Sequence, residues 1–515
     1  MSGFIVVLIL LLSVLRLPAE RINQEGRILG PLPVVMSPIL FNTSNADAVV
    51  SAMQIFPVTN PWNEDISQRP VLTNSDAMIA QITSDLTGGN PASSLRKVHV
   101  NYEMNFVLVP DNQPRAPIDF FNYPDESDLD GGTSPYGLYP IPANLPVETW
   151  PLGTGNQTLQ QWQTNDDGSD RHAIMVAPGG GFIWETWETT LTGTNWEASN
   201  GAKFDLNTNG LRPAGWTSGD AAGLPMFPAL VRFDETERGM VEHACRVTVK
   251  RTLYNNYIYP ATHYASSSGN TNANLPCMGQ RLRLKASFVI PANWSKEEKA
   301  FLSGLKKYGA IVADNGSVFG ISTAPDDRWP NGENCFDDLS SIDVTNFEVV
   351  QTTGANEGPR SPGMPMANAG LDQTVPVGAP VTLQGAVTFS NAPPVIQWKL
   401  YSGPGMVTFG NAALTNTTAT FSAPGVYTLE LSAADGVHAT AYDAAVFTAT
   451  SVIKVSIALA GTNVNINWTG GSPPYVVQEM DISLAGSWSN IVTTNANSAT
   501  IPITNTAVFF RVMGQ

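Results

Sequence analysis

The sequence predicts a mainly β protein, in which a large β-rich N-terminal domain with one or two helices precedes two smaller β-sandwich modules. At 515 residues the chain is too long for one hydrophobic core, and three or four units are expected. Only 14% of its residues are charged, while 44 glycines and 38 prolines supply turns for many short strands. The third observation is an alternation of apolar and polar residues that recurs along the chain.

The alternation is clearest in the large domain, which we place at residues 55–350. Apolar residues occupy every second position from Val98 to Leu108, so this segment is expected to be a strand with one core face. Similar patterns predict strands over residues 241–249 and 282–290. A capping box formed by Ser295 and Glu298 opens a predicted helix that ends at Tyr308, and a shorter helix is expected over residues 76–82.

The charge balance excludes one class of partner. The formal net charge is −17, so the chain has no basic surface to neutralise phosphates. We therefore expect neither nucleic acid nor an anionic membrane surface as a partner.

The first 19 residues are expected to be a secretory signal. The apolar run Phe4 to Leu15 is too short for a membrane-spanning helix, which needs about 20 residues. An uncleaved anchor is the alternative. Residues 20–54 are expected to form an N-terminal extension. The resulting protein is secreted or extracellular, has no membrane span after signal removal, and could be attached to a cell surface.

A proline- and glycine-rich break at residues 351–368 predicts a linker. Behind it, residues 369–450 contain AGLDQTV, the core residue Trp398 followed by GPG, and PGVYTLELSAADG. This module resembles the polycystic-kidney-disease-type (PKD) immunoglobulin-like fold. The resemblance implies an extracellular spacer or adhesion module without catalytic residues.

The last module, residues 452–515, is predicted from VSIALAG, VNINWTGG, YVVQEM and AVFFRVMG. Its strand pattern resembles a short fibronectin-type-III-like sandwich, which secreted bacterial proteins often carry at the C-terminus. Trp468 and Trp488 are expected to fill the core of this module.

The large domain resembles a region of uncharacterised secreted bacterial proteins. The resemblance rests on FPVTNPWN, GWTSGDAAGLP, PATHYASSSGN and YGAIVADNGS. It implies no activity, so the candidate site residues follow from local patterns.

The hairpin DRHAIMVAPGGGFIWETWE carries the main candidates. If PGGG makes a turn of two or four residues, one face holds the candidate catalytic residues Asp170, His172 and Glu185, with Trp187 as a substrate-binding ring. Two acids of different pKa beside an aromatic ring could cleave a glycan. The alternative is a half-covered structural face. The other face, with Phe182 and Trp184, is expected to be core.

Histidines outside the hairpin differ in their surroundings. His263 begins a polar Ser- and Asn-rich loop and is a candidate substrate-binding residue, with an ordinary surface loop as the equal alternative. His243 occupies one of the apolar positions in the alternation over residues 241–249 and is expected to be a hydrogen-bonded core residue.

No cofactor is expected apart from calcium, for which the acidic loop DESDLDGG offers Asp128 and Asp130 as ligands. Acidic turns on an acidic protein are the alternative. Of the three cysteines, Cys277 and Cys335 lie in loop-like sequence and are the candidate disulfide pair, whereas Cys245 is expected to be a buried thiol.

Two functions remain open from the sequence. The first is a secreted protein whose large domain binds or hydrolyses an extracellular polysaccharide or surface glycan, as a hydrolase or lyase if it is an enzyme. The second is a non-enzymatic cell-surface or matrix protein with structural or adhesive modules.

Overall fold

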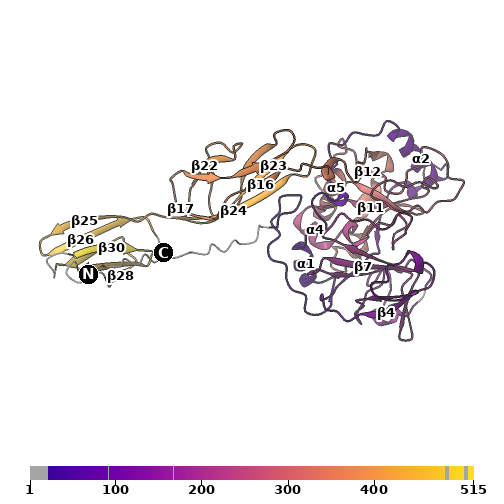
Figure 1. Cartoon of the computed structure of the whole chain (residues 1–515), viewed down its shortest axis with the longest axis horizontal. Helices are drawn as coiled ribbons and strands as arrows, with labels where there is room; N and C mark the ends of the chain where they lie inside the picture. Colours follow the sequence, from indigo (N-terminus) through magenta and orange to yellow (C-terminus); the bar gives the residue numbers. More distant parts are fainter. Residues whose placement is uncertain are drawn as a thin grey trace, which may run out of the picture. The chain divides into compact units, whose positions relative to one another are not determined.

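A computed structural model describes residues 21–90, 92–165, 167–471, 473–481, 487–503 and 508–514. The signal expected over residues 1–19 lies outside these described residues. The chain divides into a larger unit, Glu20–Pro362 with Val437–Ala439, and a smaller unit that contains Gly363–Gly436 and Thr440–Gln515. Strands dominate both units, which confirms the mainly β prediction (Figure 1).

Three sheets form the larger unit. The first has the strand order β1 (Ile39–Leu40), β3 (Val107–Leu108), β6 (Ala173–Ala177), β7 (Phe182–Trp187) and β10 (Asn200–Asp205). The second has the order β15 (Phe347–Val349), β12 (Arg281–Leu284), β13 (Ala310–Asn315), β11 (Cys245–Val249), β14 (Phe319–Thr323) and β2 (Val98–Tyr102). The third has the order β5 (Tyr136–Tyr139), β4 (Ala116–Phe120), β9 (Asn195–Ala198) and β8 (Thr190–Thr192).

Five α-helices accompany these sheets in the described part of the larger unit, more than the one or two expected. They are α1 (Ser44–Ser51), α2 (Ser75–Thr87), α3 (Leu159–Gln163), α4 (Phe233–Arg238) and α5 (Lys296–Lys307). The predicted capping box of α5 is present, because the Ser295 side chain accepts from the Glu298 amide while Glu298 bonds back to Ser295. The unexpected helices are short and show little periodicity.

Residues 20–54, expected as an extension, contribute β1 and α1 to the larger unit. β1 pairs with β3, and Val49 and Val50 of α1 lie in the main hydrophobic core. The expected linker also contacts this unit, since the Arg360 guanidinium lies 3.3 Å from the Glu64 carboxylate.

Two of the predicted strands are shorter than the sequence patterns. The alternation from Val98 to Val109 is divided between β2 and β3, which belong to different sheets. Residues 286–290 lie outside β12, and Phe288 turns back through a hydrogen bond to the Lys285 carbonyl.

The smaller unit holds two separate hydrophobic cores. Around the first lie β16 (Met366–Asn368) with β19 (Ala386–Thr388), then β17 (Gln373–Pro376), β24 (Ala441–Thr450), β23 (Gly425–Ala434) and β20 (Val395–Ser402), and finally β18 (Val381–Gln384), β22 (Asn416–Phe421) and β21 (Val407–Phe409). Trp398, expected in this core, is 1% exposed.

The second core of the smaller unit lies between two three-stranded sheets. One contains β25 (Lys454–Ala460), β26 (Asn463–Thr469) and β29 (Ser498–Pro502), and the other contains β28 (Ser489–Thr494), β27 (Tyr475–Asp481) and β30 (Val508–Met513). Trp468 is buried in this core as predicted, whereas Trp488 lies against the Arg511 guanidinium, 4.4 Å from the ring centroid. Among the described residues, none of the helices is both long and apolar enough to cross a bilayer.

Candidate functional site

The hairpin of β6 and β7 has the predicted register. Ala177 pairs with Phe182, so the turn contains four residues and the side chains sort as expected. Ile174, Val176 and Ile183 lie in the main core, and the opposite face lies in a second core with Met175 and Trp184. The hairpin therefore forms a wall between two cores.

Glu185 is enclosed by this wall and is 0% exposed. Its carboxylate accepts hydrogen bonds from the amides of Met226, at 3.0 and 2.9 Å, and Phe227, at 2.9 Å. Burial raises its pKa to about 7 even though these N–H groups favour the charged form. Because Glu185 reaches no solvent, the predicted catalytic assignment does not fit this structure, and the residue holds the turn at Phe227–Ala229 in place.

His172 is also buried, at 4% exposed. Nδ1 lies 2.9 Å from the Glu148 carboxylate and Nε2 lies 2.8 Å from the Gly219 carbonyl oxygen. Both partners are acceptors, so both ring nitrogens donate and the ring is an imidazolium. Burial lowers the pKa of His172, but the Glu148 charge and hydrogen bond outweigh it and raise the pKa to about 9. His172 therefore has no lone pair with which to act as a base, contrary to its predicted catalytic role.

Backbone strain flanks this ion pair. Thr149, next to Glu148, has a φ of 68°, and Arg171, next to His172, has a φ of 45°. A β-branched residue rarely adopts a positive φ, and strain of this kind costs about 1–3 kcal/mol and gathers at functional sites. The buried Arg171 guanidinium donates to the carbonyls of Thr189 and Trp162, which holds this segment in place.

Arg246 lies at the centre of a cluster of charged side chains on one face of the second sheet. Its Nε and Nη2 donate to the two oxygens of Asp220, each at 2.9 Å. Nη1 donates to Ser322 Oγ at 2.7 Å and to Glu103 Oε1 at 3.3 Å. The Asp314 carboxylate lies 3.8 Å from Nη2. One guanidinium thus contacts three carboxylates.

Three of the motifs on which the resemblance of the large domain rests, GWTSGDAAGLP, PATHYASSSGN and YGAIVADNGS, lie next to this cluster. The amide of Ala222, in GDAAG, donates to the Ala313 carbonyl at 2.9 Å, which places this loop beside the end of β13. The amide of His263, in THYA, donates to the Ala222 carbonyl at 3.2 Å. The Asn315 side chain, in ADNG, donates to the Ala265 carbonyl. Two backbone hydrogen bonds and one from a side chain therefore hold the three segments together.

Carboxylates outnumber cations in this cluster. The four acids are Glu103, Glu148, Asp220 and Asp314, and the two cations are Arg246 and His172.

The excess negative charge shows in the pKa values. Burial, and then the Asp220 charge, raise the pKa of Asp314 to about 7. Burial, with a contribution from Glu148, also raises the pKa of Glu103. Glu148 behaves oppositely: burial favours its neutral form, but His172 holds its pKa below the ordinary value. The side chains of Glu103 and Asp314 are 20% and 27% exposed, so both reach solvent.

Asp170 links the cluster to the hairpin. It is exposed, and its charge helps to raise the pKa values of both Asp314 and His172. Asp170 Oδ1 accepts a hydrogen bond from the half-buried Trp187 ring at 3.3 Å. The Tyr123 ring lies 6.1 Å from the Trp187 ring, centroid to centroid. The structure therefore brings the predicted residues Asp170 and Trp187 to the edge of the Arg246 cluster.

His263 lies at another part of the edge. Its Nδ1 lies 2.8 Å from the Ala221 carbonyl oxygen, so Nδ1 carries the hydrogen and Nε2 is the acceptor in the neutral ring. The ring stacks on Tyr264 with centroids 5.7 Å apart and an interplanar angle of 19°. Both rings are half-buried, so each presents one part to solvent.

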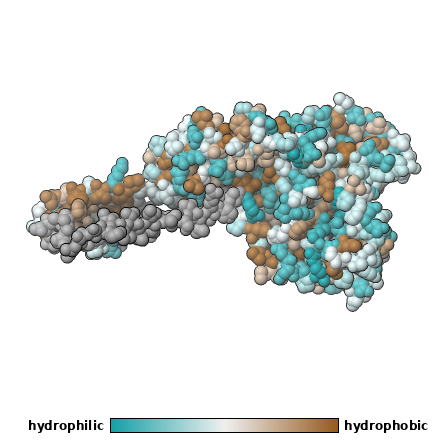
Figure 2. Space-filling view, viewed as in Figure 1, coloured by the Kyte–Doolittle hydropathy of each residue, from teal (hydrophilic) through white to brown (hydrophobic). Residues whose placement is uncertain are grey.

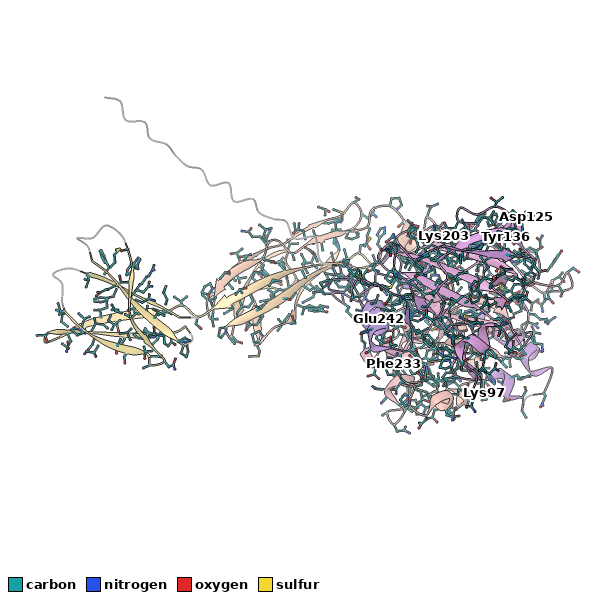
Figure 3. The ribbon with its side chains drawn as sticks, turned by 90° about the horizontal axis from the view of Figure 1, so that it is seen from below. Lys97, Asp125, Tyr136, Lys203, Phe233 and Glu242 are labelled. Atoms are coloured by element: carbon teal, nitrogen blue, oxygen red, sulfur yellow. The ribbon has the colours of Figure 1, made fainter. Side chains whose placement is uncertain are left out.

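The carboxylates of Asp128 and Asp130, which the sequence predicts as calcium ligands, form ion pairs with cationic side chains of the protein. Asp128 bonds to the Arg212 guanidinium, and Asp130 bonds to Arg115 and, at 2.7 Å, to Lys203, which Figure 3 labels. Within the described ranges no group of three or more His, Cys, Asp or Glu side chains is placed to hold a metal ion. Both carboxylates therefore pair with cationic side chains in this structure, and calcium binding at Asp128 and Asp130 stays a prediction.

The predicted disulfide between Cys277 and Cys335 is not formed, because all three cysteines are free thiols. The sequence around Cys335 looks like a loop, but the residue packs into the main core beside Phe336 and is 6% exposed. Cys245 is a buried thiol as expected, and burial raises its pKa.

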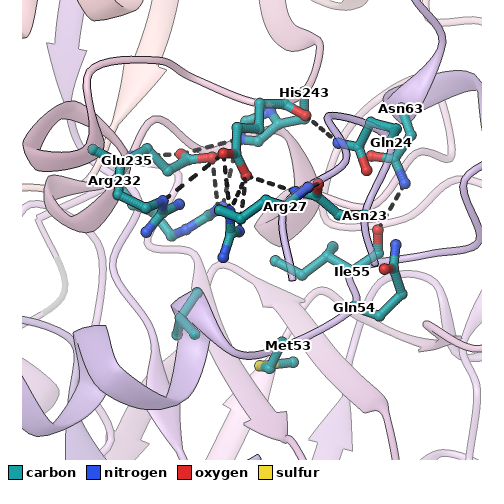
Figure 4. Close-up of a pocket in the computed structure, with 13 residues that line it drawn as sticks. Asn23, Gln24, Arg27, Met53, Gln54, Ile55, Asn63, Arg232, Glu235 and His243 are labelled. Atoms are coloured by element: carbon teal, nitrogen blue, oxygen red, sulfur yellow. Dashed lines mark hydrogen bonds and ion pairs between the residues drawn. The ribbon is translucent and has the colours of Figure 1, made fainter. Parts of the chain in front are cut away.

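His243 confirms its prediction as a core residue that is hydrogen-bonded. Nε2 lies 3.1 Å from Glu235 and Nδ1 lies 2.7 Å from the Ala244 carbonyl oxygen. It lines a small pocket that is open to solvent, which Figure 4 shows. Arg27 and Glu242 close this pocket through a bond of 2.8 Å. The charged groups of the pocket already pair with one another, so we do not assign it a ligand.

Comparison with known proteins gives matches of fold only. No family model and no curated protein matches the chain. The PKD domain of the KIAA 1837 protein is 23% identical, with 16% of this chain and 84% of that chain covered and a TM-score of 0.15. The PKD domain of human KIAA0319 is 15% identical, with 19% and 91% covered and a TM-score of 0.16. The D00–D0 domain of intimin is 13% identical, with 28% and 96% covered and a TM-score of 0.17. Two of these matched structures are PKD domains and the third is an intimin domain.

The residues at the centre of the site were not among the sequence candidates. Glu103 lies at a polar position of the alternation from Val98 to Leu108, which predicts a solvent-facing side chain, and the local sequence patterns give Asp220, Arg246 and Asp314 no role. A signal was nevertheless present, because Asp220 and Asp314 lie inside the family-like motifs GWTSGDAAGLP and YGAIVADNGS.

Proposed function

We propose that the larger unit hydrolyses glycosidic bonds of an extracellular polysaccharide at the site formed by Glu103 and Asp314. The observation that carries the proposal is that two accessible carboxyl groups contact one guanidinium while the pKa of Asp314 is raised to about 7. Each acid lies within 4.0 Å of Arg246. Their oxygens are therefore no more than about 10 Å apart, a range that includes the acid pairs of glycosidases.

Asp314 is the proton donor in this mechanism. With a pKa of about 7 it carries a proton in a large fraction of molecules at neutral pH, so it can protonate the oxygen of the leaving sugar. Glu103 is the second acid. Burial raises its pKa, and the hydrogen bonds from Ser322 and Arg246 stabilise the charged form that this role requires. It activates water or attacks the sugar carbon directly.

The remaining candidate residues are proposed to bind the sugar or to hold the loops of the site in position. Trp187 and His263 are proposed to contact sugar rings at the edge of the site, and Asp170 lies between the site and Trp187. His172 and Glu148 hold the Gly219 loop that precedes Asp220. The modules of the smaller unit are proposed to act outside the cell as spacer or adhesion modules.

The decisive test replaces Asp314 by Asn in the full chain. This variant keeps the shape of the side chain but has no proton to donate, so release of reducing ends from the polysaccharide should fall by about 100-fold or more. Asp76→Asn, at an exposed position in the first turn of α2, is the matched control and should retain full activity. Unchanged hydrolysis by Asp314→Asn, with an unchanged unfolding curve, would remove this residue from the mechanism.

A non-enzymatic adhesion protein is the second candidate, and one observation favours it. Strand β25 exposes Val455, Ile457 and Leu459, at 41%, 54% and 79%, and hydrophobic side chains are visible along this module in Figure 2. Such a strip is suited to contact with another surface. The same assay separates the candidates, since an adhesion protein would bind glycan without releasing reducing ends.

A further inference from the structure

The Arg246 site has an excess of negative charge on the side that faces solvent. Asp220 is neutralised by Arg246 and Glu148 by His172, each through hydrogen-bonded contacts. Glu103, Asp314 and the exposed Asp170 have no second cation to balance them among the charged groups that surround Arg246. A carboxylate or sulfate group on a ligand would bring further negative charge into this partly desolvated region.

Beside these acids lie three aromatic rings. Tyr254 is 39% exposed and meets Tyr264 edge to face, with centroids 5.6 Å apart and planes at 88°. Tyr264 in turn stacks on His263. The segment that carries His263 and Tyr264 is held on both sides, through Ala222 and through the Asn315 side chain, so the rings have fixed positions relative to Asp314.

Aromatic faces bind the C–H surface of a sugar ring, and this contact needs no charge on the sugar. The face of an aromatic ring carries the negative part of its quadrupole, so it also disfavours anions. The acceptor Nε2 of His263 has no hydrogen-bond partner among the residues that the structure describes, and it can accept a hydrogen bond from a sugar hydroxyl.

We infer that the substrate is a polysaccharide without uronic acid or sulfate groups, and that Tyr264 and His263 form the subsite that stacks one of its sugar rings. This inference rests on the proposed function and adds the class of substrate. The ring stack supplies the affinity, and the unbalanced carboxylates exclude anionic glycans.

Binding is tested separately from hydrolysis with the full-length Asp314→Asn chain, which keeps Glu103 and Asp170 as unbalanced carboxylates. Its migration in gels containing unsubstituted xylan, mixed-linkage β-glucan, polygalacturonate or chondroitin sulfate gives a dissociation constant for each. At low salt we expect at least one glycan without acidic groups to bind at least tenfold more tightly than the two anionic glycans. High salt should narrow the difference by screening the repulsion.

Anionic glycans that bind as tightly as uncharged ones, or more tightly, would overturn the inference. If an anionic glycan is also cleaved by the wild-type chain, the proposed function stands and only the substrate class is wrong. If no glycan is bound and none is cleaved, the proposed function fails and this inference fails with it.

The stacking subsite has its own test. Replacing Tyr264 by Ala should weaken binding of the preferred glycan by about tenfold, whereas Tyr264→Phe keeps the ring and should bind nearly as well. Tyr136→Ala is the control, because Tyr136 is 51% exposed on β5, outside the ring stack (Figure 3). Equal binding by Tyr264→Ala and the wild type would remove the stack from the site.

Discussion

At the scale of single residues, two acids have similar pKa values but differ in their exposure to solvent. Burial raises the pKa of both Asp314 and Glu185 to about 7. Asp314 keeps 27% of its side chain exposed beside other acids, whereas Glu185 has no exposure and satisfies two backbone amides. A raised pKa therefore identifies a candidate acid only when the group is also accessible.

Glu185 makes the stability of the fold depend on pH. Because its pKa in the folded state is above the ordinary value, the folded chain binds this proton more tightly than the unfolded chain does. The free energy of unfolding should therefore fall as pH rises from about 4.5 to about 7. Glu185→Gln cannot titrate and should remove part of this slope in urea denaturation followed at several pH values.

The same variant also has a cost that is present at every pH. An amide nitrogen would face one of the backbone N–H donors, and we expect a loss of about 1–3 kcal/mol. Glu237→Gln is the control, since this carboxylate is 43% exposed and should leave the pH profile unchanged. An unchanged slope in Glu185→Gln would assign the pH dependence to other groups.

Half of the predicted hairpin candidates lie where a ligand could reach them. The period of two placed Asp170, His172, Glu185 and Trp187 on one face, and the register confirms that grouping. His172 and Glu185 are covered because Gly219, Met226 and Phe227 pack over them. These covering residues are distant in the sequence, so the local pattern of the hairpin does not predict them.

At the scale of elements, the long alternation from Val98 to Val109 contains a change of sheet. β2 ends at Tyr102, and the Glu103 amide still donates to Thr323 while its carbonyl accepts from Thr149. β3 then begins at Val107 in another sheet. β3 is buried on both faces, with Leu108 in the main core and Val107 in the second core. Apolar residues therefore continue at every second position across the break, and periodicity alone does not reveal it. The break is what frees Glu103 for the site.

The loop that carries Asp220 depends on Gly223. This residue has a φ of +70°, and a Cβ atom there would lie 2.1 Å from Thr262 Oγ1 and 2.6 Å from the Trp216 carbonyl oxygen. Gly223→Ala should therefore displace both loops, lowering the hydrolysis of the polysaccharide at least tenfold and destabilising the fold by more than about 1 kcal/mol.

Gly239→Ala is the matched control for this substitution. Its φ is +91°, but nothing lies within 4 Å of the added Cβ atom. It should show only the cost of the backbone conformation, about 1 kcal/mol, with normal hydrolysis. Equal effects of the two variants on hydrolysis would show that the loop contacts do not matter.

At the scale of the whole molecule, each module is built around a core of its own. The PKD-like module buries Trp398, Leu431 and Phe447 in one cluster, and the last module buries Ile466 and Val477 in another. The proposed chemistry lies entirely in the larger unit. Stability of the modules and catalysis should therefore be separable.

Trp398→Ala tests this separation in the full chain. Removing a side chain that is 1% exposed should cost the PKD-like module about 3–5 kcal/mol and lower the temperature of one calorimetric transition. The transition of the larger unit and the rate of reducing-sugar release should stay at wild-type values. Loss of hydrolysis under conditions where the larger unit remains folded would contradict independent modules.

By itself the sequence determined the β-rich fold class, helix α5 and the buried positions of Trp398 and His243, and it gave the grouping of the hairpin side chains for a turn of two or four residues. These features follow from short-range periodicity, turns and capping, which a few consecutive residues specify. Only the tertiary structure decided the site. Glu103, Asp220, Arg246 and Asp314 come from separate segments, and their contacts and pKa values arise when distant chain segments exclude water around the same guanidinium.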